Sequence, residues 1–388
     1  MNSNLTLLRF KSILKTFLNL FVKSQKFVFI KLDTLDSFRI YHCEGSIENL
    51  YFPAIHGLTI GGEILAITRG IDLYEFHDVE FALNSDFIRF TSRGYFCDKL
   101  NRKVSLFGRC GDSDLLSIDS FKSVSLKSYK SKVYFHTVFH LTGCYSGNWS
   151  HFLVQYFPST DLLRRLPTDI PIYIVLPNGL DKHIIEMLKF VVRNFENISI
   201  QFIDSKSLVQ CSFLYYPLND TYLGDIGIIP SLFHIQTSDS TVKYVSNTCS
   251  LISAGVKSSN ISRIFIGRRG KRNITNYQDV LERFQKLGFL EVFPHLLSFE
   301  DKVALFKDAK LVAGPASSGF ANVLFSRCLE KVLAFVNPSR HDDMYLTKFA
   351  KYNKFKLELF LGVETYSCAD SDFEINLIEL DSYLDSFN

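Results

Sequence analysis

The chain has 388 residues, of which 47% are hydrophobic and 21% are charged. This length is enough for two domains with full-sized cores, and the composition is globular, which excludes a disordered or fibrous chain. A formal net charge of +3 is too small to indicate nucleic-acid binding by itself, so we expect no nucleic-acid partner.

Residues 5–26 predict an amphipathic helix whose apolar stripe is interrupted by lysine and arginine. Its longest apolar run is too short to span a bilayer, and no small-residue cleavage site follows it. Two interpretations stay open: the helix docks on the protein's own core, or it lies on an anionic membrane surface. The second interpretation would place the protein peripherally at the inner face of the membrane.

Residues 27–130 are rich in short segments of β pattern, separated by Gly, Asp, Asn and Ser. We interpret this part as an irregular β-rich region without a helix longer than two turns. A loop in it carries Asp112 and Asp114, a D-x-D pair that could hold a metal ion on a nucleotide sugar. Short acidic pairs are common in loops, so we expect no metal site there.

The eight cysteines are scattered along the chain, and no two of them form a C-x-x-C pair. This spacing argues against a zinc site and suits a reducing cytosol. We therefore expect a cytoplasmic protein without a bound metal or cofactor.

Residues 133–141 predict a buried strand that opens an α/β unit. His136 and His140 fall on one face of this strand. Because two histidines four residues apart on a straight strand are too distant to share a metal ion, we expect them to pack in the core or face a loop.

A polar motif, Asn148-x-x-His151, follows this strand and runs into apolar residues that end at Phe157-Pro158. At a helix start that faces a cleft, the imidazole of His151 could share a proton with a substrate hydroxyl or donate a hydrogen bond. The alternative is a histidine packed among aromatic residues with both ring nitrogens satisfied.

Strand and helix patterns continue to alternate beyond this motif. Residues 171–176 and 198–203 predict strands on either side of a helix capped by Asp181, and residues 213–218 predict another strand. The segment 219–260 is rich in Ser, Thr, Asp and Gly, and we predict that it is a loop-rich linker between two halves of the chain.

Residues 263–336 contain apolar runs of about five residues that alternate with helical patterns, which is typical of a parallel α/β sheet. Asn276 is expected to cap the first helix and Gly288 to end it, and Ser298 is expected to cap the second helix. Ligands of such sheets bind at the carboxyl ends of the strands.

Two features of this half fall at those carboxyl ends. Arg268 ends the first strand and could bind an anion with two parallel hydrogen bonds. The loop 314–319 has glycines that let the backbone approach a ligand, and Ser317 or Ser318 could cap a helix whose first N–H groups bind an anion. The alternative is a strand-to-helix turn without a ligand.

Both halves together resemble glycosyltransferase family 61, which includes many bacterial capsular and surface-polysaccharide enzymes. The matching residues are Asn148, His151, Pro158, Gly267-Arg268, Arg272, Gly288-Phe289, Ser298-Phe299, Leu305-Phe306, Ala309, Gly314-Pro315, Gly319 and Asn322. Three short segments depart from the family pattern. Ala316 replaces the loop histidine, Ser317-Ser318 replace Gly-Ala, and Asn276-Tyr277 replace Asn-Glu. A fourth departure is Gln155, which stands where the family has an acidic residue.

The resemblance implies an α/β fold with two Rossmann-like domains in a GT-B-like arrangement, together with the β-rich N-terminal region. We predict a helix in residues 1–26, an acceptor-side domain in 27–250 and a nucleotide-sugar domain with the tail in 251–388. Within the acceptor side, residues 27–130 are β-rich, residues 131–218 are α/β and residues 219–260 are linker-like.

The implied activity is transfer of a sugar from a nucleotide sugar, foremost a UDP-sugar, to a glycan or lipid-linked glycan acceptor in surface polysaccharide synthesis. The implied reaction is inverting and metal-independent. His151 is the candidate catalytic residue and Asn148 lies on the acceptor side. The candidate donor-binding residues are Arg268, Arg272, Gly314, Ser317, Ser318, Gly319 and Asn322.

Three other classes stay open. The departures at Ala316 and Gln155 are compatible with a non-catalytic family member that binds a nucleotide sugar or a partner protein. A different Rossmann-like enzyme, such as an epimerase or dehydrogenase, is less compatible because the G-x-G-x-x-G fingerprint is absent. The third class is a structural protein of the membrane surface, and residues 5–26 are the only part of the sequence that favours it.

Overall fold

The computed structural model describes residues 37–44, 47–51, 54–56, 63–67, 71–83, 87–90, 94–97, 116–120, 123–126, 131–143, 146–218, 237–338, 345–364 and 371–385. The helix predicted at residues 5–26 and the Asp112–Asp114 pair lie outside these residues. Across the described part of the chain, no helix combines the length and the apolar character that crossing a membrane would need.

The first lobe is built on an eight-stranded sheet with the order β12–β11–β10–β13–β5–β6–β7, to which β1 adds by pairing with β5. Its strands are β1 (Arg39–Cys43), β5 (Ile71–Ala82), β6 (Phe87–Phe90), β7 (Gly94–Cys97), β10 (Ser131–Phe139), β11 (Ile172–Pro177), β12 (Ile198–Ile203) and β13 (Ser207–Leu218). The four strands β10 to β13 are parallel, whereas β5 pairs antiparallel with β13.

Helices follow two of the parallel strands. After β10 the chain forms one continuous helical run of three types, and after β11 it forms a regular helix. These elements are α3 (Trp149–His151), the π-helix η2 (Phe152–Tyr156), the 3₁₀-helix η3 (Phe157–Arg165) and α4 (Lys182–Val192). Asp181 caps α4 as predicted, because its side chain accepts a hydrogen bond from the His183 N–H.

The second lobe is built on a parallel sheet with the order β15–β14–β16–β17–β18–β3. Its strands are β14 (Arg263–Ile266), β15 (Leu290–Val292), β16 (Leu311–Pro315), β17 (Lys331–Val336), β18 (Lys356–Leu361) and β3 (Ala54–His56). Its helices are α6 (Tyr277–Lys286), η4 (Pro294–Leu296), α7 (Phe299–Phe306), η5 (Ser318–Phe325), α8 (Thr347–Asn353) and α9 (Leu377–Asp385). The remaining described strands form three two-stranded ladders, β2 (Ile47–Tyr51) with β4 (Glu63–Ile67), β8 (Leu116–Ser120) with β9 (Ser123–Leu126), and β19 (Val363–Glu364) with β20 (Phe373–Glu374).

Two of the three helix-end signals predicted for the second lobe, Ser298 and Gly288, act as the sequence predicts, whereas Asn276 does not. The Ser298 hydroxyl accepts from the Asp301 N–H at the start of α7, and Gly288 follows α6 with a φ of 82°. Helix α6 begins after Asn276, but that side chain bonds both the N–H and the C=O of Ile375 instead of capping the helix. The amide therefore joins the start of α6 to the C-terminal tail.

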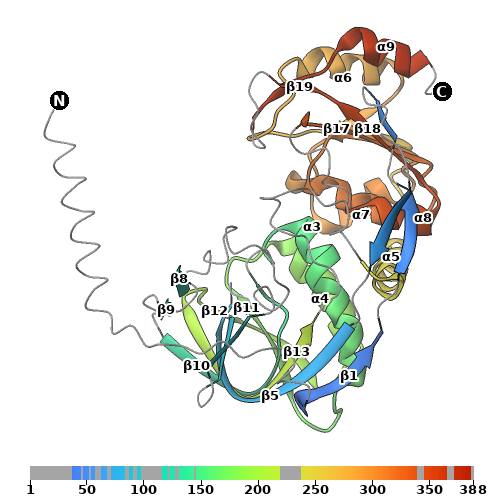
Figure 1. Ribbon diagram of the computed structural model, residues 1–388. Coiled ribbons are helices and arrows are strands. Elements are labelled where there is room, and N and C mark those ends of the chain that lie inside the picture. Colours follow the sequence, from blue (N-terminus) through green and yellow to red (C-terminus); the bar gives the residue numbers. More distant parts are fainter. Residues whose placement is uncertain are drawn as a thin grey trace, which may run out of the picture.

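The two faces of the second sheet alternate along its strands. One face, with Phe265, Leu333 and Phe360, is covered by α6 and α9. The other face, with Ile264 and Val312, is covered by α7, η5 and α8, and its core continues without interruption into the first lobe. Helical layers therefore lie between the two sheets (Figure 1).

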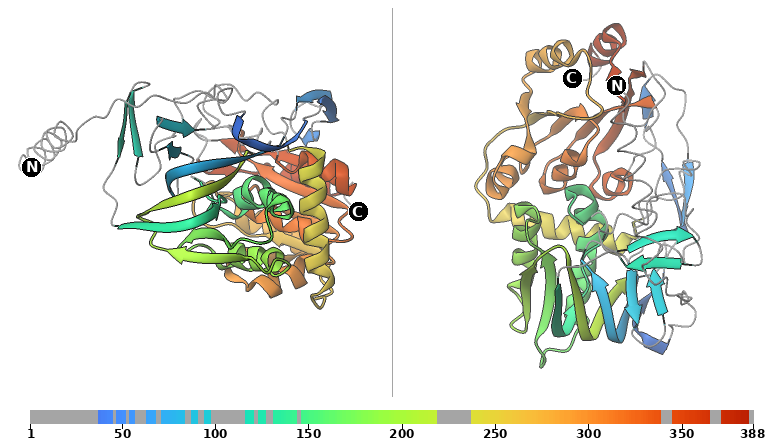
Figure 2. Two further views of the ribbon diagram at one scale, coloured as in Figure 1. Left: turned by 90° about the horizontal axis from the view of Figure 1, so that it is seen from below. Right: turned by 90° about the vertical axis from the view of Figure 1, so that its left-hand side faces the viewer.

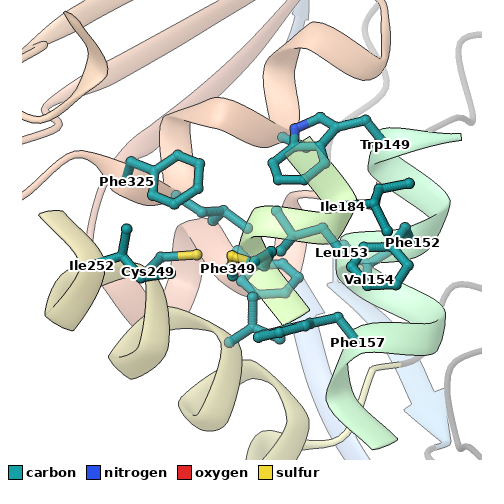
Figure 3. Packing of buried hydrophobic residues seen from close by; sticks show 14 of the residues in the cluster. Trp149, Phe152, Leu153, Val154, Phe157, Ile184, Cys249, Ile252, Phe325 and Phe349 are labelled. Carbon is teal, nitrogen blue, oxygen red and sulfur yellow. The ribbon is translucent and has the colours of Figure 1, made fainter. Parts of the chain in front are cut away.

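The lobes meet through this shared core. Trp149 of α3 stacks on Phe325 of η5, and the cluster extends through Ile252 to Phe349 (Figure 3). Figure 2 shows α5 (Asp239–Ala254) lying between the two lobes. Its Ser253 hydroxyl donates to the Phe325 carbonyl, so α5 is also hydrogen-bonded to the second lobe.

Two features correct the predicted organisation. The segment 219–260 was expected to be loop-rich, yet residues 239–254 form helix α5, which is capped by Ser238. Its Ser and Thr content resembles a loop, but the buried stripe with Val242, Val245 and Ile252 holds it as a helix. In addition, β3 belongs to the predicted N-terminal domain and nevertheless pairs with β18 at the edge of the second sheet.

The two predicted strand histidines differ in their surroundings. His140 is buried, and its ring packs against Phe81 and Tyr216, as expected for a core histidine. His136 is exposed, and its Nδ1 lies 2.9 Å from the Thr137 hydroxyl. In the described residues, no group of three or more His, Cys, Asp or Glu is placed to hold a metal ion.

Candidate active site

Each sheet has a point where the strand order reverses. In the second sheet, the chain leaves β14 to form β15 on one side and then returns to form β16 on the other side. In the first sheet, β11 and β13 flank β10 in the same way. Open α/β sheets bind ligands in the crevice that this reversal creates at the carboxyl ends of the strands. The candidate site is therefore expected after β14, β16 and β10.

The loop after β16 passes directly over the end of β14. Gly314 has a φ of 145°, and a Cβ atom added there would lie 2.4 Å from the Ile266 carbonyl oxygen. A Cβ atom added at Gly319 would lie 3.1 Å from Ile266 Cγ2. Glycine is thus required at 314 and favoured at 319, because the loop 314–319 packs against the backbone and side chain that end β14.

Arg268 joins the two strand ends across the crevice. Its Nε donates to the Lys271 carbonyl at 2.7 Å, and its Nη1 donates to the Ala316 carbonyl in the loop 314–319. The guanidinium group is half-buried. The structure therefore brings Arg268 to the loop as the sequence predicts, and the positive charge lies beside the start of η5.

The other arginines of the basic segment point to different partners. Arg272 is half-buried and has a φ of 59°, which marks a tight turn in the segment 268–273. Arg269 lies over the Phe293 ring, with its guanidinium carbon 4.7 Å from the ring centre. Among the described contacts, only that of Arg268 reaches the loop 314–319 from this basic segment.

The loop residues lead into η5. Ser318 is exposed and opens the helix, whose first N–H groups have no partner inside it. Ser317 stands at the capping position without a capping hydrogen bond from its side chain. Asn322 is fully buried, and its Nδ2 donates to the Gly319 carbonyl at 2.7 Å. Asn322 thus stabilises the turn from behind and would act on a ligand only through the loop backbone.

The first lobe contributes the motif around His151. Asn148 caps α3, because its Oδ1 accepts from the Ser150 N–H at 3.1 Å and from the His151 N–H at 3.4 Å. His151 is half-buried, and its Nδ1 lies 2.9 Å from the Gln155 Oε1. Because an amide oxygen can only accept, Nδ1 is the donor in this contact. Gln155 fixes the ring without supplying a negative charge.

The backbone at His151 is also unusual. The helix changes there from α to π, since residues 152–156 form the π-helix η2. Such π-helical turns are rare and occur frequently at functional sites. Helix α3 packs against η5, as the stacking of Trp149 on Phe325 shows. The structure thus brings the His151 helix and the helix of the Gly-rich loop together at the lobe junction.

A buried polar group occupies this junction, and the sequence does not predict it. Lys302 of α7 is 2% exposed, and its Nζ lies 4.8 Å from the centre of the Trp149 ring. His183 of α4 is equally buried, with its ring centre 6.2 Å from that of Trp149. Burial lowers the pKa of Lys302 to about 8, although Asp181 opposes this shift, and burial together with Lys302 lowers the pKa of His183 to about 4.

A comparison with known families finds one that matches the segment containing this junction. Residues 149–333 match the family Glycosyltransferase 61. The matched segment starts at Trp149 and includes His151, Arg268 and the loop 314–319. The match supports glycosyltransferase family 61 and a sugar-transferring enzyme with a sugar donor and an acceptor. A search of curated proteins found no match.

Two residues of the matched segment, Trp149 and Lys302, were not predicted from the sequence as part of the lobe junction. Trp149 is the single tryptophan of the chain and lies within the His151 motif, so its position was a usable signal. Lys302 stands on the apolar stripe of α7, at a spacing of three residues from Phe299. A charged residue on an otherwise apolar stripe was a second usable signal.

Proposed function

We propose that the protein is a glycosyltransferase with a GT-B-like arrangement that uses a nucleoside-diphosphate sugar as donor and a glycan or lipid-linked glycan as acceptor. The observation that carries this proposal is the contact between the Arg268 guanidinium and the Ala316 carbonyl. It puts a fixed positive charge beside the start of η5, in the crevice where parallel sheets bind ligands.

The chemistry at this crevice follows from charge. Displacement at the anomeric carbon leaves a nucleoside diphosphate, on which negative charge grows in the transition state. Arg268 is held beside the start of η5 by its two carbonyl contacts, so its positive charge needs little reorganisation to act there. Arg272 supplies a second positive charge in the same loop. These groups support binding of a diphosphate that leaves with its bonding electron pair.

The acceptor side is assigned to the first lobe. Asn148 sets the start of α3, and Gln155 holds the His151 ring with Nε2 as its proton-accepting nitrogen. In this role His151 orients the acceptor hydroxyl and takes part in a hydrogen bond during transfer. We also propose that the protein acts in surface polysaccharide synthesis and contacts the membrane peripherally.

A second function is favoured by one observation. The residue that contacts His151 Nδ1 is an amide, and an amide cannot stabilise an imidazolium ion as a carboxylate would. Together with Ala316, this arrangement favours a family member that binds a nucleotide sugar without transferring it. Incubation with a panel of nucleotide sugars, followed by detection of released nucleoside diphosphate, distinguishes transfer from binding.

The donor site is tested by Arg268→Ala with UDP as the probe. We expect the substitution to weaken UDP binding in calorimetry by about 1.5–3 kcal/mol, because a charge-assisted contact to phosphate is lost. Arg327→Ala, which removes an exposed arginine of the same lobe, is the matched control and should leave UDP affinity unchanged. Equal UDP affinity of the Arg268 variant and the wild type would contradict the assignment.

A further inference from the structure

Helix α7 carries a lysine where its neighbours are buried apolar side chains. Phe299, Val303 and Phe306 pack into the shared core, and Lys302 falls on the same stripe. Lys302 is 2% exposed, nearly as buried as Val303 and Phe306 and more buried than Phe299, which is half-buried. A buried ammonium group is unfavourable unless it has a partner, so its surroundings must compensate.

The partner comes from the other lobe. The Lys302 Nζ lies over the face of Trp149, on α3, at 4.8 Å from the ring centre. The Trp149 ring also packs against the rings of Phe325 in η5 and His183 in α4. Lys302 and Trp149 therefore form a desolvated cation–π contact between the lobes, of the kind that is strongest when water is excluded.

The charged groups around Lys302 come mainly from the start of α4. Asp181 attracts the ammonium group, Lys182 repels it, and the neutral ring of His183 lies beside Trp149. Burial outweighs the attraction of Asp181 and lowers the pKa of Lys302 to about 8. His183, whose pKa is lowered to about 4, does not change its charge in the same range.

Position in the chain links this contact to the candidate active site. Trp149 precedes His151 by two residues in the three-residue helix α3, whose start is fixed by the Asn148 cap. Residues 149–151 are the first turn of the helical run 149–165, where the N–H groups have no partner inside the helix, so the Asn148 cap and side-chain contacts determine where this turn lies. Replacing a buried charge by an apolar residue often leaves a fold equally stable, which argues that Lys302 serves position more than stability.

We propose that Lys302 is a positioning residue: its contact with Trp149 holds α3, and with it His151, against the lobe that carries Arg268 and the loop 314–319. The consequence for turnover rests on the proposed glycosyltransferase function. The Lys302–Trp149 contact does not depend on that function, so the contact and its consequence for turnover can be tested separately.

The first test uses Trp149 as a reporter, because it is the only tryptophan in the chain. Excitation at the red edge of the indole band, where tyrosine does not absorb, reports on the surroundings of Trp149, which include the Lys302 ammonium group. Between about pH 7 and about pH 9, we expect a shift of the emission maximum as Lys302 loses its proton. Lys302→Met should abolish this shift, and Lys310→Met, which removes an exposed lysine of the same lobe, should keep it. A wild-type emission without this transition, or a transition that survives in Lys302→Met, would overturn the proposal.

The second test measures where α3 lies. In Lys302→Met, amide hydrogen exchange of residues 149–156 should become faster, while the midpoint of urea unfolding stays at or above the wild-type value. Lys302→Arg keeps the cation over the ring and should restore slow exchange. Unchanged exchange in Lys302→Met overturns the proposal, and so does faster exchange spread evenly over both lobes, because that would be general destabilisation.

Turnover gives the catalytic readout. Lys302→Met should lower kcat by roughly ten- to a hundredfold, because a small misplacement of a reacting group is costly, while KM for the donor stays within about twofold. Lys302→Arg should recover most of kcat. Equal kcat in Lys302→Met and wild type would contradict positioning. A wild-type chain that shows the emission transition but neither binds nor turns over a nucleotide sugar would contradict the proposed function and leave the Lys302 contact standing.

Discussion

Single residues at the lobe junction have roles that their local contacts define. Asn148 and Gln155 do not reach out toward a ligand in the described contacts; they fix the start of α3 and the ring of His151. Asn322 likewise bonds the Gly319 carbonyl behind the loop 314–319. The residues that match the family pattern thus include supports of the site as well as groups that can meet a substrate.

His151 is expected to matter for turnover more than for binding. We predict that His151→Ala lowers turnover by about ten- to a thousandfold, because the acceptor hydroxyl loses its hydrogen-bonding partner, with little change in donor affinity. Steady-state kinetics and calorimetry with UDP measure the two effects. His136→Ala, which removes an exposed histidine of β10, serves as the control. A loss of UDP affinity equal to the loss of turnover would place His151 in the donor site instead.

At the scale of elements, the carboxyl ends of β14 and β16 form one rigid unit. The loop 314–319 crosses the end of β14 at a distance that leaves no room for a side chain on Gly314. Arg268 then connects the segment after β14 to the same loop. A loop that is held from two sides needs little ordering if a ligand binds to it, so such binding would lose less entropy.

The fit of this loop can be tested with Gly314→Ala. We predict destabilisation by at least about 2 kcal/mol, because the added Cβ meets backbone atoms of Ile266 and the φ of 145° is strained for any other residue. Urea unfolding of the purified variant measures the loss. Gly147→Ala is the matched control, since a Cβ there has open space around it. Similar unfolding midpoints for both variants would show that the loop can shift away from β14.

At the scale of the whole molecule, elements far apart in the sequence share their cores. The strand β3, from the first sixty residues, completes the edge of the second sheet beside β18. Glu358 of β18 is buried there, and it pairs with Lys356, accepts a hydrogen bond from the Tyr383 hydroxyl, and lies 3.8 Å from His56 of β3. This polar cluster joins β3, β18 and α9.

Tyr383→Phe tests the cluster. Burial raises the pKa of Glu358, but the hydrogen bonds from Lys356 and Tyr383 outweigh it and hold the pKa below the usual value. We predict that the variant loses about 1.5–3 kcal/mol of stability at neutral pH, because a hydrogen bond to a buried carboxylate disappears. Urea unfolding measures this loss, and Tyr352→Phe, at an exposed tyrosine, is the control.

The difference in stability between wild type and Tyr383→Phe is expected to depend on pH. A carboxyl group with a lowered folded-state pKa contributes stability above its unfolded pKa of about 4.3, and this contribution falls as pH drops through the folded pKa. The difference between wild type and Tyr383→Phe should therefore be constant near neutral pH and shrink in acid. A difference that grows as the pH falls would mean that the tyrosine contact does not favour the carboxylate.

Short-range signals in the sequence were enough to predict many of the strands and helices and where they begin or end. The strands β11, β12, β14, β16 and β17 appear where apolar runs predict them, and Ser298, Asp181 and Gly288 end or begin helices as expected. These features depend on hydrogen bonds and packing between residues a few positions apart, which are the same in every fold that contains them. Arg268 and the loop 314–319 were also foreseen, because both follow strands of one sheet.

Other features depend on partners that are distant in the sequence. Helix α5 has the composition of a loop and becomes a helix because Val245 and Ile252 are buried between the lobes. By residue type, Lys302 is expected at the surface, but in the folded protein it lies under Trp149 of the other lobe. The sequence by itself determined the α/β class, the place of Arg268 and the loop 314–319 after strands of one sheet, and the His151 motif. Only the tertiary structure decided that β3 joins the second sheet and that a buried cation lies between the lobes, because burial and long-range pairing are properties of the packed chain.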